Sequence, residues 1–231
     1  MIYYIGTEPG TFEIFGDSDE RFYLDGGSEQ ITQRLAQLLA GLIQTTTVLE
    51  SIREQSGGRF LVSLRSGISS FERIYERVIL TVPFSVLRTI EIDVELPEIK
   101  REAIDTVGYG TNSKIITGYT EKIWRTRFNS RGNIFTDLGF QNTRESSNSR
   151  YASNTVGLMT NYTGGSQGIA IGAGTVQDQA QQFNTNLEAV FSGINAVAIR
   201  NQAERGFWTG SPFSLGSYLC YRPGEFTRFY G

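Results

Sequence analysis

The sequence GGSEQITQRLAQLLAGLI, residues 26–43, starts with two glycines and continues as an amphipathic segment. Apolar residues recur in it at three- and four-residue spacing, which places their side chains on one face of a helix. These residues are Ile31, Leu35, Leu38, Leu39, Leu42 and Ile43. The pattern predicts a helix with one buried face. Ser28 is the expected N-cap, because a serine hydroxyl accepts a hydrogen bond from the first helical turn.

Strand patterns follow this helix. Residues 47–53 and 60–64 flank Ser56-Gly57-Gly58, which predicts a hairpin turn. Residues 77–82, RVILTV, are mostly apolar and β-branched and stop at Pro83, which predicts a buried strand ended by that proline. A helix and strands in close succession indicate part of an α/β sheet.

The second half of the chain mixes further strands with two helices. Residues 97–107 predict a short helix, with Pro97 in its first turn and Gly108 at its exit. A second strong helix begins at Thr175, where Asp178 is placed for a capping box. Its expected buried face consists of Val176, Ala180, Phe183, Leu187, Val190 and Phe191. Strands are expected at residues 114–119, 157–162 and 168–171, and a polar surface loop at 141–154.

Composition excludes several classes of protein. The 231 residues include 21 basic and 24 acidic side chains, so neither a nucleic-acid nor a membrane partner gains electrostatic support. There is no histidine, which excludes Ser-His-Asp and Cys-His catalysis and histidine-ligated zinc. The single cysteine, Cys220, excludes an internal disulfide and a cysteine-cluster metal site, and we expect it to be a small buried residue. No metal is expected.

Targeting signals are not evident in the sequence. No apolar run approaches the ~20 residues that span a bilayer. Residues 1–20 lack the basic start and apolar stretch of a secretory signal. These features favour a cytoplasmic protein, although they leave the compartment open.

Glycine motifs for a dinucleotide phosphate are weak. Such a site needs glycines where a strand turns into a helix, so that backbone N–H groups reach the phosphate, and the pattern GxGxxG is absent. Gly172-Ala173-Gly174 is closest to it and is more simply a turning loop. Gly108-Tyr109-Gly110 also fails the pattern and is interpreted as a helix C-cap.

Two other features are more specific. Lys114 lies on an expected strand, where a lysine that points to solvent is the simpler interpretation. The segment FWTGSPFSLGSY, residues 207–218, spaces glycines through aromatic residues. A small aromatic core accounts for that spacing, and so does a flat ring that the backbone approaches closely.

At these residues the chain resembles the flavin-containing amine oxidase family, which includes monoamine, polyamine and L-amino-acid oxidases. Four blocks follow the order of the family's motifs across nearly the whole chain. They are Gly26-Gly27 with Gln30 and the helix; Val78 to Pro83; Gly110 to Lys114 with Trp124; and Trp208 to Tyr218 with Pro223-Gly224.

The resemblance implies an α/β (α+β) fold: an incomplete Rossmann-like FAD-binding domain plus a mixed-sheet substrate domain backed by helices. Residues 1–25 would end a substrate-domain excursion, 26–111 would form part of the FAD-binding domain, 112–205 the substrate domain, and 206–231 a truncated return to the FAD-binding domain. Family members are longer, with a GxGxxG turn before the matched region and a second FAD-contacting segment after it. We therefore expect a truncated product, a pseudogene-like fragment or one half of a split enzyme.

The resemblance also implies roles for five residues. Lys114 matches the lysine that holds a water at the flavin N5, and Tyr218 matches one wall of an aromatic cage; these two are the catalytic candidates. Val48, Trp208 and Ser217 are the cofactor-binding candidates. Val48 matches a backbone contact to the adenine end of FAD, and Trp208 a tryptophan packed near the isoalloxazine ring. Ser217 stands where monoamine oxidases have the flavin-linked cysteine, so FAD is expected to bind non-covalently.

The implied function is FAD-dependent oxidation of an amine or L-amino acid to the imine, with formation of hydrogen peroxide. The flavin carries this chemistry, so the absence of histidine is compatible with it. Because a pyrophosphate site is missing, the chain alone is expected to be inactive and to need a partner chain carrying the missing FAD-binding segments. The alternative is a non-catalytic remnant or an interaction module of the same fold, whose exposed apolar surface favours association.

Overall fold

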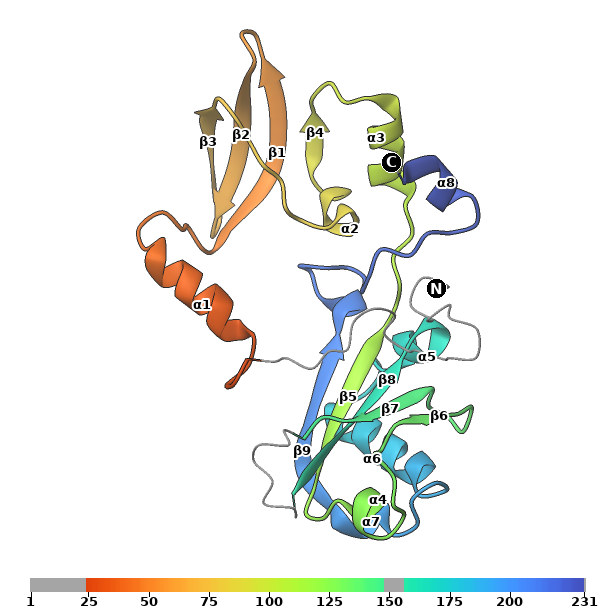
Figure 1. The fold of residues 1–231 in the computed structure, drawn as a ribbon. Coiled ribbons are helices and arrows are strands. Elements are labelled where there is room, and N and C mark those ends of the chain that lie inside the picture. Colours follow the sequence, from red (N-terminus) through yellow and green to blue (C-terminus); the bar gives the residue numbers. More distant parts are fainter. Residues whose placement is uncertain (1–23, 148–155, 231) are drawn as a thin grey trace. The chain divides into compact units, whose positions relative to one another are not determined.

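The computed structural model describes residues 24–147 and 156–230. The chain divides into two compact units, residues 1–48 with 65–70 and residues 49–64 with 71–231. Its strands form a four-stranded sheet in the order β3-β2-β1-β4 and a five-stranded sheet in the order β6-β7-β8-β5-β9 (Figure 1). Helices accompany both sheets, so the mixed α/β class that the sequence predicts is confirmed.

The four-stranded sheet contains the predicted hairpin. Gly57 and Gly58 turn the chain between its two strands with φ values of 87° and 72°, which only glycine adopts easily. The short strand β4 pairs in parallel with β1, with Ser51 opposite Glu91. The strands are β1 (Thr47–Gln55), β2 (Arg59–Ser66), β3 (Ser69–Tyr75) and β4 (Glu91–Asp93).

The buried strand predicted at residues 77–82 is wrong. These residues form no helix or strand, and Ile79 is 88% exposed. An apolar run becomes a strand only where a neighbouring strand offers its backbone groups, and no described strand pairs with residues 77–82. After Pro83 the chain instead forms the short helix α2 (Phe84–Leu87).

The first predicted helix forms, but without its buried face. α1 (Glu29–Leu38) is shorter than expected and contains no buried residue; Leu38 is 66% and Leu42 81% exposed. Ser28 precedes it in a helical conformation, and its side chain makes no capping bond, so the predicted cap is also wrong. Spacing of apolar residues predicts a helix, whereas burial depends on a surface that the described residues do not provide.

The helix predicted at residues 97–107 is confirmed as α3 (Glu98–Thr106), which Pro97 precedes. Gly108 is not its C-cap, because Val107 takes that position. A Cβ atom at Gly108 would collide with the backbone carbonyl oxygen of Cys220. Gly108 is therefore needed for close approach of two backbone segments, and Cys220 is exposed rather than buried as predicted.

The five-stranded sheet is built around β5 (Ser113–Tyr119). β5 pairs antiparallel with β8 (Gly157–Thr163) on one side and with β9 (Ala198–Phe207) on the other. β7 (Asn142–Glu145) and β6 (Ile134–Phe135) extend the sheet beyond β8. β9 has no counterpart in the sequence prediction, and β7 lies where a polar loop was expected; residues 148–155 of that loop are outside the described residues.

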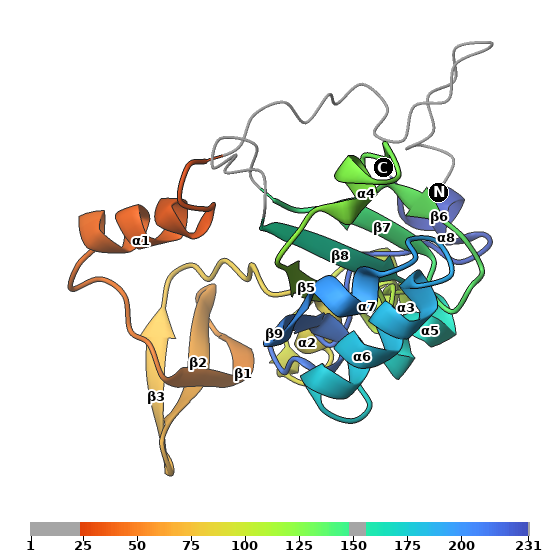
Figure 2. The ribbon, with the colours of Figure 1, turned by 90° about the horizontal axis from the view of Figure 1, so that it is seen from below.

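One face of this sheet is covered by helices (Figure 2). α6 (Val176–Leu187) starts with the predicted capping box of Thr175 and Asp178 and packs on β5 and β9. The preceding α5 (Gly165–Ala170) replaces the strand predicted at 168–171, because a short apolar run does not distinguish a strand from a buried helix. The remaining helices here are α4 (Ile123–Thr126) and α7 (Ile194–Val197).

The core lies between this sheet and its helices. Its fully or nearly fully buried members are Tyr119, Ile123, Trp124, Phe140, Met159, Phe183, Leu187, Phe191 and Ile194. Side chains of a strand alternate between faces, so the buried Ser113, Ile115 and Thr117 face α5 and α6. Lys114 therefore points to the opposite face of the sheet, where it is half-buried.

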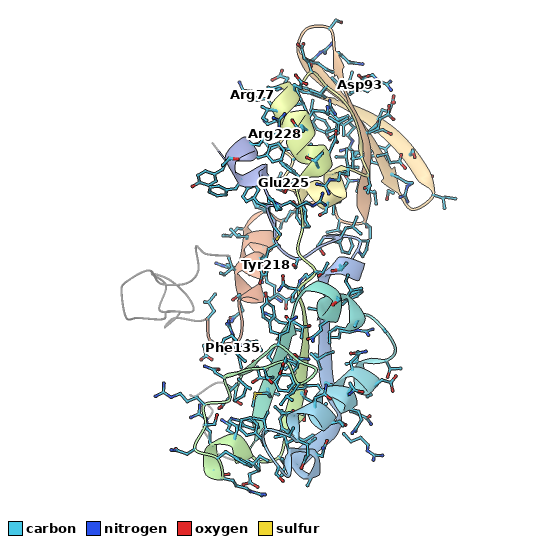
Figure 3. The ribbon with its side chains drawn as sticks, turned by 90° about the vertical axis from the view of Figure 1, so that its right-hand side faces the viewer. Arg77, Asp93, Phe135, Tyr218, Glu225 and Arg228 are labelled. Atoms are coloured by element: carbon cyan, nitrogen blue, oxygen red, sulfur yellow. The ribbon has the colours of Figure 1, made fainter. Side chains whose placement is uncertain are left out.

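The C-terminal segment runs back along residues 108–112. The backbone N–H of Gly110 donates to the Tyr218 carbonyl at 2.7 Å, and that of Cys220 donates to the Gly108 carbonyl at 2.8 Å. The segment then forms α8 (Glu225–Phe229), where Arg228 pairs with Glu102 of α3. Figure 3 shows Glu225 and Arg228 on α8 and Tyr218 on the segment before it.

Candidate functional site

Lys114 lies between two aromatic rings. On β8 its antiparallel partner is Tyr162, and on β9 its partner is Gly206. The Lys114 Nζ atom is 5.4 Å from the centroid of the Tyr162 ring and 5.5 Å from the Trp208 ring. Both distances are within the range of attraction between an ammonium group and an aromatic face. The simpler interpretation, a lysine that only points to solvent, is not what the structure has.

The Trp208 indole reaches Lys114 because Gly206 has no side chain. Trp208 begins a 3-10 turn, Trp208–Gly210, directly after β9. A Cβ atom at Gly206 would lie 2.9 Å from the Cη2 atom of Trp208, so the indole occupies the space that a side chain there would take. The indole remains 36% exposed, which leaves part of its surface available for contact.

Ser217 and Tyr218 are held beside this group by the returning segment. The Ser217 hydroxyl accepts a bond from the Asn112 backbone N–H and donates one to the Asn112 Oδ1 atom, both at 3.0 Å. Tyr218 is 61% exposed. Burial raises the pKa of Tyr162, and a hydrogen bond with Tyr218 raises that pKa further. The two phenol groups are therefore neighbours.

The structure brings together four of the five candidates, Lys114, Trp208, Ser217 and Tyr218, within the second compact unit. Val48 belongs to the first unit, at the start of β1, where it is 48% exposed. Tyr162 was missed from the sequence, because its link to Lys114 depends on the register of β5 with β8. An aromatic residue in the expected strand 157–162 was the only available signal.

The arrangement suits a flat aromatic ligand rather than a metal. It offers an ammonium group, a partly exposed indole and an exposed phenol, interspersed with glycine-rich backbone. Within residues 24–147 and 156–230, no three histidine, cysteine or acidic side chains gather as metal ligands. No helix in these ranges is both long and apolar enough to span a bilayer.

Comparisons with known proteins identify the family. The model of flavin containing amine oxidoreductases matches residues 7–231. Protein FLOWERING LOCUS D of Arabidopsis thaliana is 29% identical over 230 residues, which cover 88% of this chain and 26% of that protein. A flavin-containing amine oxidase of Danio rerio is 29% identical over 133 residues, which cover 55% of this chain and 24% of that protein.

Solved structures show the same fold. Putrescine oxidase bound to putrescine aligns with a TM-score of 0.71 at 17% identity, over 88% of this chain and 44% of that one. Cyclohexylamine oxidase from Brevibacterium oxydans IH-35A aligns with a TM-score of 0.68 at 17% identity, over 94% of this chain and 44% of that one. The chain thus spans about a quarter of the curated relatives and less than half of the solved chains. The cofactor of the matched family is FAD. On the match over residues 7–231, this chain belongs to the flavin containing amine oxidoreductase family.

Proposed function

We propose that this chain is the central part of an FAD-dependent oxidase that converts an amine or an L-amino acid to the imine and forms hydrogen peroxide. The observation that carries the proposal is the grouping of Lys114, Trp208 and Tyr218 around one face of the five-stranded sheet. Family membership supports it, because these are the residues to which the family resemblance gives active-site roles.

The residues present fit a flavin. A flat ring system finds the partly exposed indole of Trp208 for stacking and the Lys114 ammonium as a hydrogen-bond donor. When bound, FAD supplies the two-electron oxidation of the substrate's carbon–nitrogen bond. The Lys114 ammonium holds and orients a water molecule, and the Tyr218 ring orients the amine through its electron-rich face.

The division of labour along the chain is part of this proposal. Residues 26–111 and 206–231 contribute to the FAD-binding domain, with Val48 near the adenine end, and residues 112–205 form the substrate domain. Residues 1–25 end an excursion of the substrate domain. Ser217 has no thiol, and its hydroxyl already bonds Asn112, so FAD binds non-covalently.

The test is an absorbance spectrum of the purified chain, taken before and after incubation with FAD and desalting. Retained flavin bands would show that the chain builds enough of a cofactor site to hold FAD. A colourless protein that stays colourless in the presence of a partner chain carrying the remaining FAD-binding segments would refute the proposal.

The role of Lys114 has a matched control. Lys114→Met removes the ammonium but keeps much of the aliphatic stem, while Lys100→Met makes the same change at an exposed position of α3. In the completed enzyme, Lys114→Met slows flavin reduction or reoxidation, and Lys100→Met does not. Equal rates for both variants in both half-reactions would rule out the role.

The chain alone is proposed to be inactive and to require a partner chain. A peroxide assay with amines, L-amino acids and a lysine peptide should give no signal for the chain by itself and a substrate-dependent signal after complementation. The peptide is included because two relatives from Arabidopsis thaliana are named lysine-specific histone demethylase 1 homologs.

A second candidate function is a non-catalytic interaction module. It is favoured by the exposed apolar side chains, among them Leu42 at 81% and Ile79 at 88%. Association of the chain with itself or with another protein, without flavin retention under any of the conditions above, would select this alternative. Reading the flanking DNA for a frame that encodes GxGxxG distinguishes a split oxidase from a remnant.

A further inference from the structure

Lys114 has a flexible side chain, and its two aromatic neighbours come from different strands. Trp208 follows β9, while Tyr162 is its direct partner on β8, on the opposite side of β5. With a ring on each side, the ammonium loses attraction in whichever direction it swings. Each ring contact at such a partly exposed site changes the equilibrium between docked and free ammonium about two- to fivefold.

Tyr162 also touches the other half of the site. It is half-buried, and its side chain hydrogen-bonds that of Tyr218, which is itself 61% exposed. The backbone of Tyr218 is fixed by its bond to Gly110, but nothing in that bond selects the direction of the phenol. A hydroxyl partner on the rigid sheet selects it.

We propose that Tyr162 is a positioning residue that links both halves of the candidate site: its ring holds the Lys114 ammonium, and its hydroxyl orients Tyr218. This inference rests on the proposed function for its catalytic meaning, and its structural content is measurable without FAD. The two tasks use different parts of one side chain, so two substitutions separate them. Tyr162→Phe removes the hydroxyl only, and Tyr162→Leu removes both.

The ring is tested by iodide quenching of tryptophan fluorescence in the full chain. Trp124 is fully buried and Trp208 is 36% exposed, so collisional quenching reports on Trp208. An ammonium held against the indole concentrates iodide there. Lys114→Met should lower the iodide quenching constant, relative to that of neutral acrylamide, by about twofold. Tyr162→Leu should lower it nearly as far, whereas Tyr162→Phe should leave it unchanged.

The hydroxyl is tested by NMR of the chain with ¹³C-labelled tyrosine. Tyr162→Phe should shift the ring resonance of Tyr218, while Tyr230→Phe, at another exposed tyrosine of the C-terminal segment, should not. The Phe variant keeps the ring, so it also serves if the Leu variant fails to fold. An unchanged Tyr218 resonance in Tyr162→Phe would overturn the hydroxyl's role.

The outcomes separate this inference from the proposed function. Normal iodide quenching in a folded Tyr162→Leu variant overturns the ring's role even if the chain retains FAD. Conversely, a chain that never binds FAD but shows both effects contradicts the proposed function and supports the linkage. In a completed enzyme, the linkage predicts that Tyr162→Phe raises KM with kcat kept, and that Tyr162→Leu lowers kcat as well.

Discussion

Two helices of this chain have similar sequence patterns and opposite surroundings. α1 and α6 are both amphipathic, yet α1 contains no buried residue, while α6 buries Ala180, Phe183 and Leu187 against the five-stranded sheet. α6 also has a complete capping box, and α1 has no side-chain cap. The comparison teaches that apolar spacing determines which face of a helix is sticky, and that a neighbouring surface determines whether the face is buried.

The difference has an energetic side. An isolated helix of about ten residues is marginal in water, because nucleation is costly and packing normally supplies the stability. α6 receives that packing within the described chain, and α1 does not. Substitutions should therefore have large effects around α6 and small effects on α1.

The largest expected effect is at the core of the α6 region. Phe183 is 2% exposed and packs edge-on against Phe140, with ring centroids 5.6 Å apart. Phe183→Ala should lower the free energy of unfolding by about 3 to 5 kcal/mol, measured by urea denaturation followed through Trp124 fluorescence. A loss below 1 kcal/mol would show that this core is loosely packed, and the comparison with α1 would fail.

The next effect concerns an ion pair buried in the same region. The side chains of Lys122 and Glu145 are each 7% exposed and 3.2 Å apart. Glu145→Gln leaves the lysine charge without its partner and should cost about 2 to 4 kcal/mol at neutral pH. Lys122→Met in the same background should recover part of this loss, since no buried charge then remains.

The same pair predicts a pH dependence. Burial raises the pKa of Glu145, but hydrogen bonds from Trp124 and Arg125 and the charge of Lys122 outweigh burial, so the pKa is lowered overall. A carboxyl with a lowered folded pKa stabilises the fold above its unfolded pKa, and that stability is lost as the pH falls through the folded value. Unfolding curves of wild type and Glu145→Gln should therefore differ fully at pH 7 and converge below about pH 4. A constant difference down to pH 2 would contradict the assignment.

Capping gives a smaller and more direct comparison of the two helices. Thr175 accepts a bond from the Asp178 backbone N–H at 3.1 Å, whereas the Ser28 side chain caps nothing. Thr175→Ala should cost about 1 kcal/mol, and Ser28→Ala should cost less than about 0.5 kcal/mol. Equal losses in urea denaturation would mean that α1 is capped in solution after all.

The smallest effect on stability is expected on the apolar face of α1. Leu38 and Leu42 are 66% and 81% exposed, so Leu38→Ser and Leu42→Ser should each change the free energy of unfolding by less than about 0.5 kcal/mol. The same substitutions should reduce self-association in sedimentation experiments, because they break up an apolar face. A large loss of stability would place this face in a core, and the contrast with α6 would disappear.

Local patterns could be predicted from the sequence where the cause is local. The capping box at Thr175, the hairpin at Gly57-Gly58 and the helix after Pro97 all depend on nearby residues, and all three are confirmed. β9 and the strand at 142–145 were missed, because their polar residues become strand residues only through pairing with β5 and β8.

The candidate site shows the same division. Lys114, Trp208 and Tyr218 were found through a family resemblance that extends along the chain. Tyr162 was not, since its role depends on the register of two strands whose paired residues are 48 positions apart. Residues 77–82 failed for the opposite reason, because an apolar run indicated a partner strand that the described residues do not contain.

The bond between Asn112 and Ser217 joins residues 105 positions apart, and this separation dictates an order of assembly. β5 and β8, with Lys114 and Tyr162, can pair while the C-terminal segment is still inside the ribosome, which releases about 5 to 20 residues per second. Tyr218 docks only when nearly the whole chain has emerged. During synthesis, the sheet half of the site thus exists before its other half, and for that interval the Lys114 surface is accessible to any molecule present.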